Sequence, residues 1–395
     1  MTIFRLTFEH AIRDDKAVQT TTLDAQSQPT AFPVPLRMIT EFPGLRLPPP
    51  TVLDGPLFST LMIPMRHGGR VLEIDGPISA SAMRNVQAFQ EAWVSMLPDR
   101  LNFVEVVPKE VVEDLPVRGR AAVVAFSGGL DCTFTLLRHA KKLLGHGSYP
   151  ITHALMVHGL DLQLRRKGIF KNLRQRVAPL LDELGVKLIV ARSNVRNPLP
   201  DAPGAQVQPY AYSQAAQIAG LLHVLPERQF AYGVIGSTDP YRKLVLPWGS
   251  NPATDYLLSN DRFSIVHDGA AFTRPEKAAL VAKHPTALRS LRVCLAQTRG
   301  NCGLCEKCVR TRLNLMVVGV DNPDCFDQPF HDEMIDTLEV WDPSVLHEAN
   351  FTLAHADAIG MSAPWLGKLK GRIAAFSGAK GSARPKPRPR LDNGA

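Results

Sequence analysis

The fold is decided by one stretch of the chain, Ala121-Ala122-Val123-Val124-Ala125-Phe126-Ser127-Gly128-Gly129-Leu130-Asp131-Cys132. Its first half is a continuous apolar run, which predicts a short strand buried on both faces. The Gly-Gly pair permits a tight turn, and the residues after it predict a helix that runs to about Leu144. This order brings backbone N–H groups and the positive end of a helix to one point. The stretch therefore predicts a cradle for phosphate oxygens.

From Arg120 onward, apolar runs alternate with amphipathic segments. Further strands are expected at 152–157, 187–191 and 230–235, and helices at 165–184 and 210–225. Near-continuous apolar strands separated by helices are typical of a parallel sheet covered on both faces. The sequence therefore predicts an α/β fold with a doubly wound parallel sheet, which binds ligands beyond the carboxyl ends of its strands.

The loop after the first of these strands supplies the candidate phosphate site. Ser127 adds a hydroxyl, and Asp131 is placed to hold a magnesium ion that bridges phosphates. The alternative is a structural turn in which Asp131 only caps the helix. On the phosphate interpretation, the residues that contact the nucleotide are Ser127, Gly128, Gly129, Leu130, Asp131 and Cys132.

Four of the six cysteines form a tight group, Cys294, Cys302, Cys305 and Cys308. Disulfide frameworks spread along small secreted chains, whereas such a group in a long chain indicates a metal. Four thiolates with this spacing suit tetrahedral zinc and leave no open position, so the ion would be structural. An iron–sulfur cluster is the rival interpretation, because Cys-x-x-Cys-x-x-Cys also occurs in ferredoxins.

The net charge of +8 is concentrated at the C-terminus. Eight Lys and Arg residues and one Asp follow position 367, so residues 1–367 carry a net charge of only +1. A broad basic face for duplex nucleic acid is therefore not expected. The chain also lacks an apolar run of roughly 18 residues and an apolar leader, so we expect a cytoplasmic protein that does not contact a membrane.

The segment Ser127–Cys132 resembles the PP-loop of the N-type ATP pyrophosphatases, a family that includes NAD synthetase and GMP synthetase. The order of the later motifs narrows the resemblance. Gly236-Ser237-Thr238-Asp239, then a helix that carries Lys277, then the cysteine group form an order similar to that of the 7-cyano-7-deazaguanine synthases (QueC). The similarity covers about residues 120–326 and implies an adenine nucleotide alpha hydrolase-like (HUP) fold.

The resemblance also implies roles for individual residues. ATP would be cleaved to AMP and pyrophosphate, with Mg²⁺ held at Asp131. Ser237 and Asp239 would face the phosphates, Asp239 as a second metal ligand. Lys277 would neutralise charge as pyrophosphate departs, so Asp131 and Lys277 are the expected catalytic residues. Cys132 departs from the family, which usually has Ser or Thr there, and a thiol is a weaker hydrogen-bond donor.

The function implied by the resemblance is that of a ligase or synthase. A carboxylate substrate of the 7-deazaguanine type is adenylated and transferred to ammonia or an amine, as in queuosine biosynthesis. Long QueC-like proteins also resemble those of bacterial anti-phage operons, in which a protein partner is substrate or companion. Two alternatives stay open: a PP-loop enzyme that modifies tRNA through the basic residues of 165–176, and a non-catalytic nucleotide-binding scaffold in a multiprotein defence complex.

Four regions are expected along the chain. Residues 1–115, punctuated by prolines, predict a small α+β domain of unassigned role whose first half is irregular or made of short strands. Residues 120–326 form the nucleotide domain with its four-cysteine zinc site, and residues 327–378 a helical extension; the N-terminal domain or this extension would bind a protein partner. Residues 379–395 alternate proline with cations and are expected to be a disordered basic tail.

Overall fold

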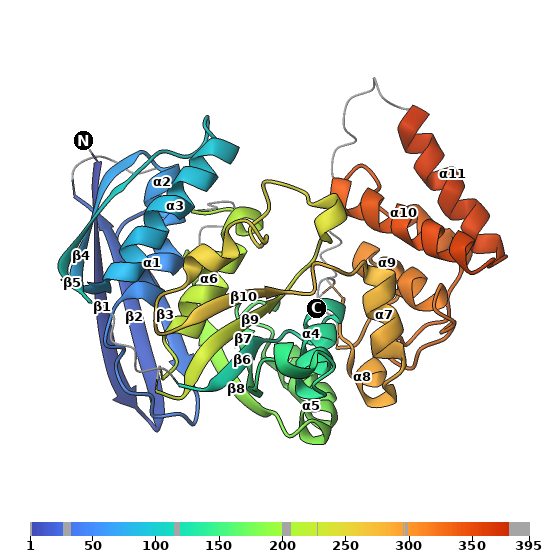
Figure 1. Cartoon of the computed structure of the whole chain (residues 1–395), viewed down its shortest axis with the longest axis horizontal. Coiled ribbons are helices and arrows are strands. Elements are labelled where there is room, and N and C mark those ends of the chain that lie inside the picture. Colours follow the sequence, from blue (N-terminus) through green and yellow to red (C-terminus); the bar gives the residue numbers. More distant parts are fainter. Residues whose placement is uncertain are drawn as a thin grey trace.

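A single sheet runs through the molecule and positions the candidate site (Figure 1). The computed structural model describes residues 2–26, 33–113, 119–199, 207–226, 228–294, 296 and 299–378. Within these residues the sheet has ten strands in the order β10-β9-β6-β7-β8-β3-β2-β1-β4-β5. Most neighbouring pairs are parallel, which confirms an α/β fold with a largely parallel sheet.

The half of the sheet that carries the Ser127–Cys132 loop is entirely parallel. It consists of β6 (Ala121–Ala125), β7 (Ile151–His158), β8 (Lys187–Ser193), β9 (Phe230–Gly236) and β10 (Ser264–Asp268). The chain runs outward from β6 through β7 to β8, then crosses to the other side of β6 for β9 and β10. The strand order therefore reverses between β6 and β9, where open parallel sheets bind ligands. Strand β10 is an addition to those expected from the sequence.

The N-terminal region continues the same sheet. Its strands are β1 (Thr2–Arg13), β2 (Lys16–Ala25), β3 (Leu36–Phe42), β4 (Gly69–Ser79) and β5 (Glu105–Val112). Strand β3 pairs antiparallel with β8, and the hydroxyls of Thr40 and Ser193 lie 2.9 Å apart across this junction. The expectation of irregular or short strands in the first half was wrong, because β1 and β2 form a long hairpin and the prolines follow it.

Both faces of the central strands are buried. Val123 packs in one apolar cluster with residues of α1 and α6, whereas Ala122 and Val124 pack in another with residues of α4 and α5. Successive residues of a strand point to opposite faces, so a strand covered on both sides needs an unbroken apolar run. The sequence of β6 meets this requirement, since all three side chains are fully buried.

The helices surround this sheet. Their bounds are α1 (Asp54–Thr60), α2 (Met62–Arg66), α3 (Ala80–Met96), α4 (Leu130–Ala140), α5 (Lys167–Glu183), α6 (Tyr210–His223), α7 (Arg274–Ala282), α8 (Pro285–Ser290), α9 (Glu306–Met316), α10 (Pro343–Ala358) and α11 (Pro364–Gly378). Short 3₁₀ turns lie at η1 (Gly145–Gly147), η2 (Tyr241–Lys243), η3 (Asp255–Leu258) and η4 (Asp332–Thr337). Helix α4 follows β6 directly, as the motif requires.

The region after residue 327 is helical. Helices α10 and α11 and the turn η4 pack with α9 around an apolar cluster that includes Trp365 and Leu369. In Figure 1 these two helices lie at the opposite end of the molecule from the N-terminal strands. The expected basic tail, 379–395, lies outside the described residues. Across the described ranges, none of the helices combines the length and apolar character needed to cross a membrane.

Candidate functional site

The β6–α4 loop has the geometry that phosphate binding requires. Gly128 has a φ of +78°, and a Cβ at this position would lie 3.1 Å from the side chain of Leu173, so the turn favours glycine. Gly129 is the N-cap residue of α4, and no side chain caps the first turn of this helix. Because the first N–H groups of a helix have no intrahelical acceptor, they can bind an anion.

Cys132 lies inside this loop. Its Sγ accepts the backbone N–H of Ser127 at 3.4 Å, and its S–H donates to the carbonyl of Gly129 at 3.3 Å. Burial raises the pKa of the thiol, so it stays protonated near neutral pH. Cys132 therefore braces the turn from within, and Ser127 Oγ lies 3.7 Å from its sulfur.

A pocket of about 200 Å³ lies at the carboxyl ends of β6, β7 and β9, and the loop forms part of its wall. Apolar side chains such as Phe126 and Met156 line it. Three cations, Arg274, Arg292 and Lys307, also line it. Ligand pockets combine apolar walls with a few placed polar groups, and this one adds an excess of positive charge beside a phosphate-type loop.

Asp131 lies in the first turn of α4 and is paired with two cations of α7. Its Oδ1 lies 3.3 Å from Lys277 Nζ, and its Oδ2 lies 3.0 Å from Arg274 Nη2. Burial opposes ionisation of the carboxyl, but these two cations outweigh it and hold the pKa of Asp131 below its ordinary value. Asp131 is therefore a carboxylate whose charge is balanced from α7.

Lys277 bonds to two other residues of the site expected from the sequence, Asp131 and Ser237. Its side chain is fully buried and donates both to Asp131 and to the carbonyl of Ser237. Burial lowers the pKa of Lys277, and the Asp131 charge opposes this effect. The start of α7 is fixed by a capping box between Thr273 and Glu276, which sets where Lys277 points.

Among the residues that the structure describes, no cation forms an ion pair with the carboxylate of Asp239. Burial raises the pKa of Asp239 to about 6, and the charges of Asp131 and Glu348 add to this effect. The hydroxyl of Ser344 on α10 donates to its Oδ2 at 3.4 Å, and the Ser237 hydroxyl donates to its backbone carbonyl at 2.7 Å. A buried carboxylate with a raised pKa in a site of this kind is a candidate functional group.

Sequence reasoning missed the cations Arg274, Arg292 and Lys307 and the carboxylate Glu348. Arg274 lies one helical turn before Lys277, so the pair could have been recognised as one face of α7. Lys307 lies between two cysteines of the metal motif and has no spacing signal of its own. Glu348 lies far along the chain on α10, and only the tertiary structure brings it to Arg274.

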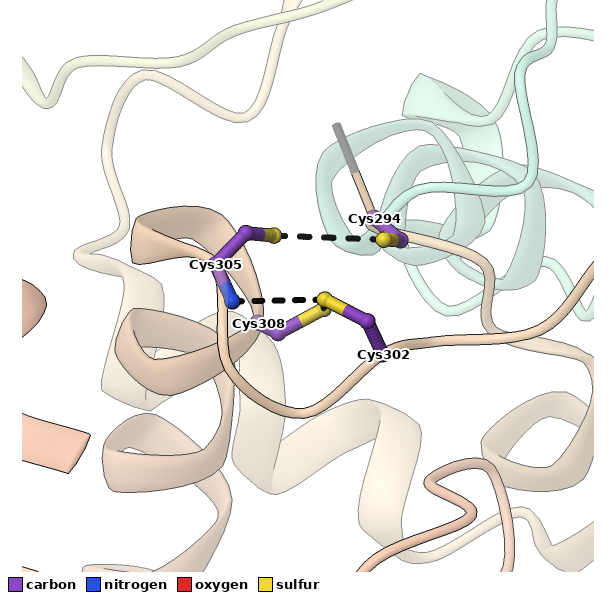
Figure 2. A group of neighbouring side chains, drawn as sticks. All are labelled: Cys294, Cys302, Cys305 and Cys308. Atoms are coloured by element: carbon purple, nitrogen blue, oxygen red, sulfur yellow. Dashed lines mark hydrogen bonds between the residues drawn. The ribbon is translucent and has the colours of Figure 1, made fainter. Parts of the chain in front are cut away.

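The four cysteines expected to bind a metal form one group (Figure 2). Their sulfurs all lie within 4.8 Å of one another, and the Cys302–Cys308 and Cys294–Cys305 pairs are each separated by 3.9 Å. Tetrahedral zinc–thiolate bonds of about 2.3 Å place sulfurs about 3.8 Å apart, so the spacing fits. The group can therefore bind a metal such as zinc.

The backbone around this group is arranged for metal binding. Gly303 has a φ of +75°, which lets the chain turn between Cys302 and Cys305, and the N–H of Cys305 donates to Cys302 Sγ at 3.3 Å. Buried Asn301 holds the adjoining segments together. It accepts from the N–H of Val293 and Cys294 and donates to the carbonyls of Leu291 and Cys325.

The cysteine group and the pocket share one wall. Arg292 and Cys294 line the pocket, and the backbone N–H of Arg292 donates to the carbonyl of Gly128 at 2.8 Å. Lys307, between Cys305 and Cys308, lines the same pocket. A metal bound by the four thiols would therefore fix two pocket cations relative to the phosphate loop.

Comparisons of the chain with protein-family models, curated proteins and solved structures return no match. The features of the site that indicate a function are a glycine loop at a helix N-terminus, a group of cations around it and a four-cysteine centre.

We expect the purified protein to contain one metal ion per chain and the Cys305→Ser variant to lose it. A serine hydroxyl is a poor substitute for a thiolate ligand, and a structural metal contributes folding free energy. The measurements are elemental analysis, a visible absorption spectrum and thermal unfolding. The control is Cys325→Ser, a fully buried cysteine outside the group, which should retain the metal. Native protein with reduced cysteines and no metal would contradict this assignment.

We expect Asp239→Asn to raise the free energy of unfolding at pH 8 by roughly 1 to 3 kcal/mol. The pKa of about 6 lies above the ordinary value, so ionised Asp239 destabilises the folded state above that pH. The gain should shrink as the pH falls from 6 towards 4 and vanish below the ordinary carboxyl pKa, at about pH 3, where Asp239 is protonated in both the folded and the unfolded state. Chemical denaturation at several pH values measures this. The control is Asp336→Asn, whose side chain is 60% exposed. A gain that grows towards acid pH would contradict the prediction.

Proposed function

We propose that the chain is an ATP pyrophosphatase of the PP-loop type with a HUP-like fold, and that it adenylates a carboxylate substrate. One observation carries the proposal: an uncapped helix N-terminus after a Gly-Gly turn lies beside buried Lys277 and the pocket cation Arg274, where the strand order reverses. Helix N-termini and buried cations both favour polyphosphate anions. The apolar part of the pocket would take the adenine and ribose.

Lys277 and Arg274 would stabilise the charge of the departing pyrophosphate. Both are buried and preorganised by Asp131, so no large rearrangement is needed when charge develops. The Nε–H of Arg274 has no acceptor among the described residues, which leaves it one donor for a phosphate oxygen. Lys307 and Arg292, which also line the pocket, would add positive charge.

Magnesium is implied by the family resemblance, and the residues fit it. The carboxylates of Asp131 and Asp239 are hard oxygen donors of the kind that Mg²⁺ prefers. The pKa of Asp239 is raised because burial and neighbouring carboxylates disfavour its charge, and a bound cation would relieve this. When bound, Mg²⁺ would supply charge neutralisation to the phosphates.

The proposed reaction has two steps. A substrate carboxylate oxygen attacks the α-phosphorus of ATP, and the bond to the β-phosphate oxygen breaks, so pyrophosphate leaves and an acyl-adenylate forms. The nitrogen of ammonia or an amine then attacks the acyl carbon and loses a proton, and AMP leaves with the electron pair of the C–O bond. The chain orients the reactants and supplies fixed charge rather than a covalent nucleophile.

The substrate class follows from the QueC resemblance. We propose a 7-deazaguanine-type carboxylate, with ammonia or an amine of a protein partner as acceptor. The four cysteines would hold zinc in a closed structural site, because all four ligand positions are taken by thiolates. Cytoplasmic biosynthesis and phage defence are both compatible with this chemistry.

One observation favours a non-catalytic nucleotide-binding scaffold as the second candidate. Both oxygens of Asp131 are already paired with cations, and the thiol of Cys132 forms hydrogen bonds within the loop.

The tRNA-modifying alternative depends on the basic residues of α5. Arg176 of that helix donates to the carbonyls of Leu291 and Cys325, so it serves the fold rather than an exposed basic face.

The decisive experiment measures AMP and pyrophosphate formation from ATP by purified protein, with 7-carboxy-7-deazaguanine and ammonium as candidate substrates. We expect Asp131→Ala and Lys277→Ala to lower the rate by about 100-fold or more, because Asp131 would orient both cations and hold Mg²⁺, and Lys277 would neutralise charge on the departing pyrophosphate. The matched control is Lys171→Ala, an exposed cation on α5. Formation of ADP and phosphate, or wild-type protein that does not bind ATP, would contradict the proposal. ATP binding without AMP under any condition favours the scaffold.

A further inference from the structure

Helix α10 lies beyond the region that the family resemblance covers, yet it reaches the candidate site. It packs on α7 and α9, as Figure 1 shows. Ser344 in its first turn contacts Asp239, and Glu348, one turn further along the same face, enters the interior. Helix α10 therefore forms part of the site rather than a separate appendage.

Glu348 is a buried carboxylate that accepts hydrogen bonds from several neighbouring side chains. Its side chain is 6% exposed, and its Oε2 lies 3.3 Å from Arg274 Nη1 and 2.9 Å from Arg310 Nη1. Its Oε1 accepts from the amide of Asn314. A buried charge is costly unless it is paired and hydrogen-bonded, and Glu348 meets both conditions.

Arg274 lies between Glu348 and the phosphate loop. One end of its guanidinium donates to Glu348 and the other to Asp131, at 3.3 Å and 3.0 Å. The side chain is 5% exposed and lines the pocket, and its Nε–H has no acceptor among the described residues. Two carboxylates therefore fix the plane of this guanidinium while its Nε–H stays without an acceptor in the described part of the chain.

We propose that Glu348 is a positioning residue that holds Arg274 in the orientation in which it binds the phosphates of the nucleotide. This inference rests on the proposed function and extends it to a helix outside the resemblance. Without the charge of Glu348, Arg310 repels Arg274, and Asp131 becomes the one carboxylate that holds the guanidinium. Arg274 then turns its donors to Asp131 and has fewer left for phosphate, so anion affinity falls although the site becomes more positive.

The test compares the full-length wild-type chain with Glu348→Gln in calorimetric titrations with inorganic pyrophosphate and with Mg-ATP. Glutamine keeps the side-chain length and the oxygen that accepts from Asn314 but removes the charge. We expect both dissociation constants to rise about 5- to 10-fold, with an unchanged circular dichroism spectrum. The matched control is Asp357→Asn, a carboxylate on the same helix that is 66% exposed, which should bind like wild type.

A double-mutant cycle separates positioning from a purely structural role. Arg274→Lys removes the guanidinium that Glu348 holds but keeps the positive charge. If Glu348 acts through Arg274, Glu348→Gln causes no further loss of pyrophosphate affinity in the Arg274→Lys background. Equal losses in both backgrounds would overturn the inference, and so would unchanged or tighter binding by the single variant.

Failure of the proposed function would give a different result from failure of the role of Glu348. Wild-type protein that binds neither ligand overturns both proposals. Wild-type protein that binds both ligands, with Glu348→Gln binding equally well, overturns only the role of Glu348. If Glu348→Gln does not fold, Glu348→Asp keeps the charge and shortens the reach, and we expect it to bind pyrophosphate more weakly than wild type; equal binding overturns the inference.

Discussion

The site depends on one buried balance of charge, in which the carboxylate of Asp131 lies between Lys277 and Arg274. Buried charges destabilise a fold unless they are paired, so these groups require α4 and α7 to pack in one arrangement. Glu348 extends the requirement to α10. The same packing fixes the N-terminus of α4 at the end of β6. The position of the loop and the arrangement of the cations therefore both depend on this packing.

The cysteine group imposes a second constraint on the same loop. Its residues flank Arg292 and Lys307, and Arg292 is bonded through its backbone to Gly128. A metal at this centre would therefore stabilise the part of the pocket lined by Arg292, Cys294 and Lys307, while ion pairs hold Asp131 and Arg274 in place. Rigid walls suit the proposed function, in which the site orients a polyphosphate and balances its charge.

The sequence predicted the features that local pattern determines. The apolar run of β6 predicts a buried strand and the glycine pair predicts a turn. The close spacing of the four cysteines predicts that their side chains form one group. The strand β10 was missed because it is short and its place depends on pairing with β9. The long β1–β2 hairpin was missed because β2 is rich in threonine and the nearby prolines suggested irregular structure. Glu348 and Lys307 could not be assigned, since no spacing rule links them to Asp131 and packing alone brings them together.

The most direct measurement is a crystal structure of the protein with a non-hydrolysable ATP analogue and Mg²⁺. The account predicts that the triphosphate lies on the backbone amides of Gly129 and Leu130, within hydrogen-bond distance of Arg274 and Lys277, with the adenine against the apolar wall near Met156. A structure in which the analogue binds elsewhere, or in which the loop stays blocked by its own side chains at saturating nucleotide, would contradict it.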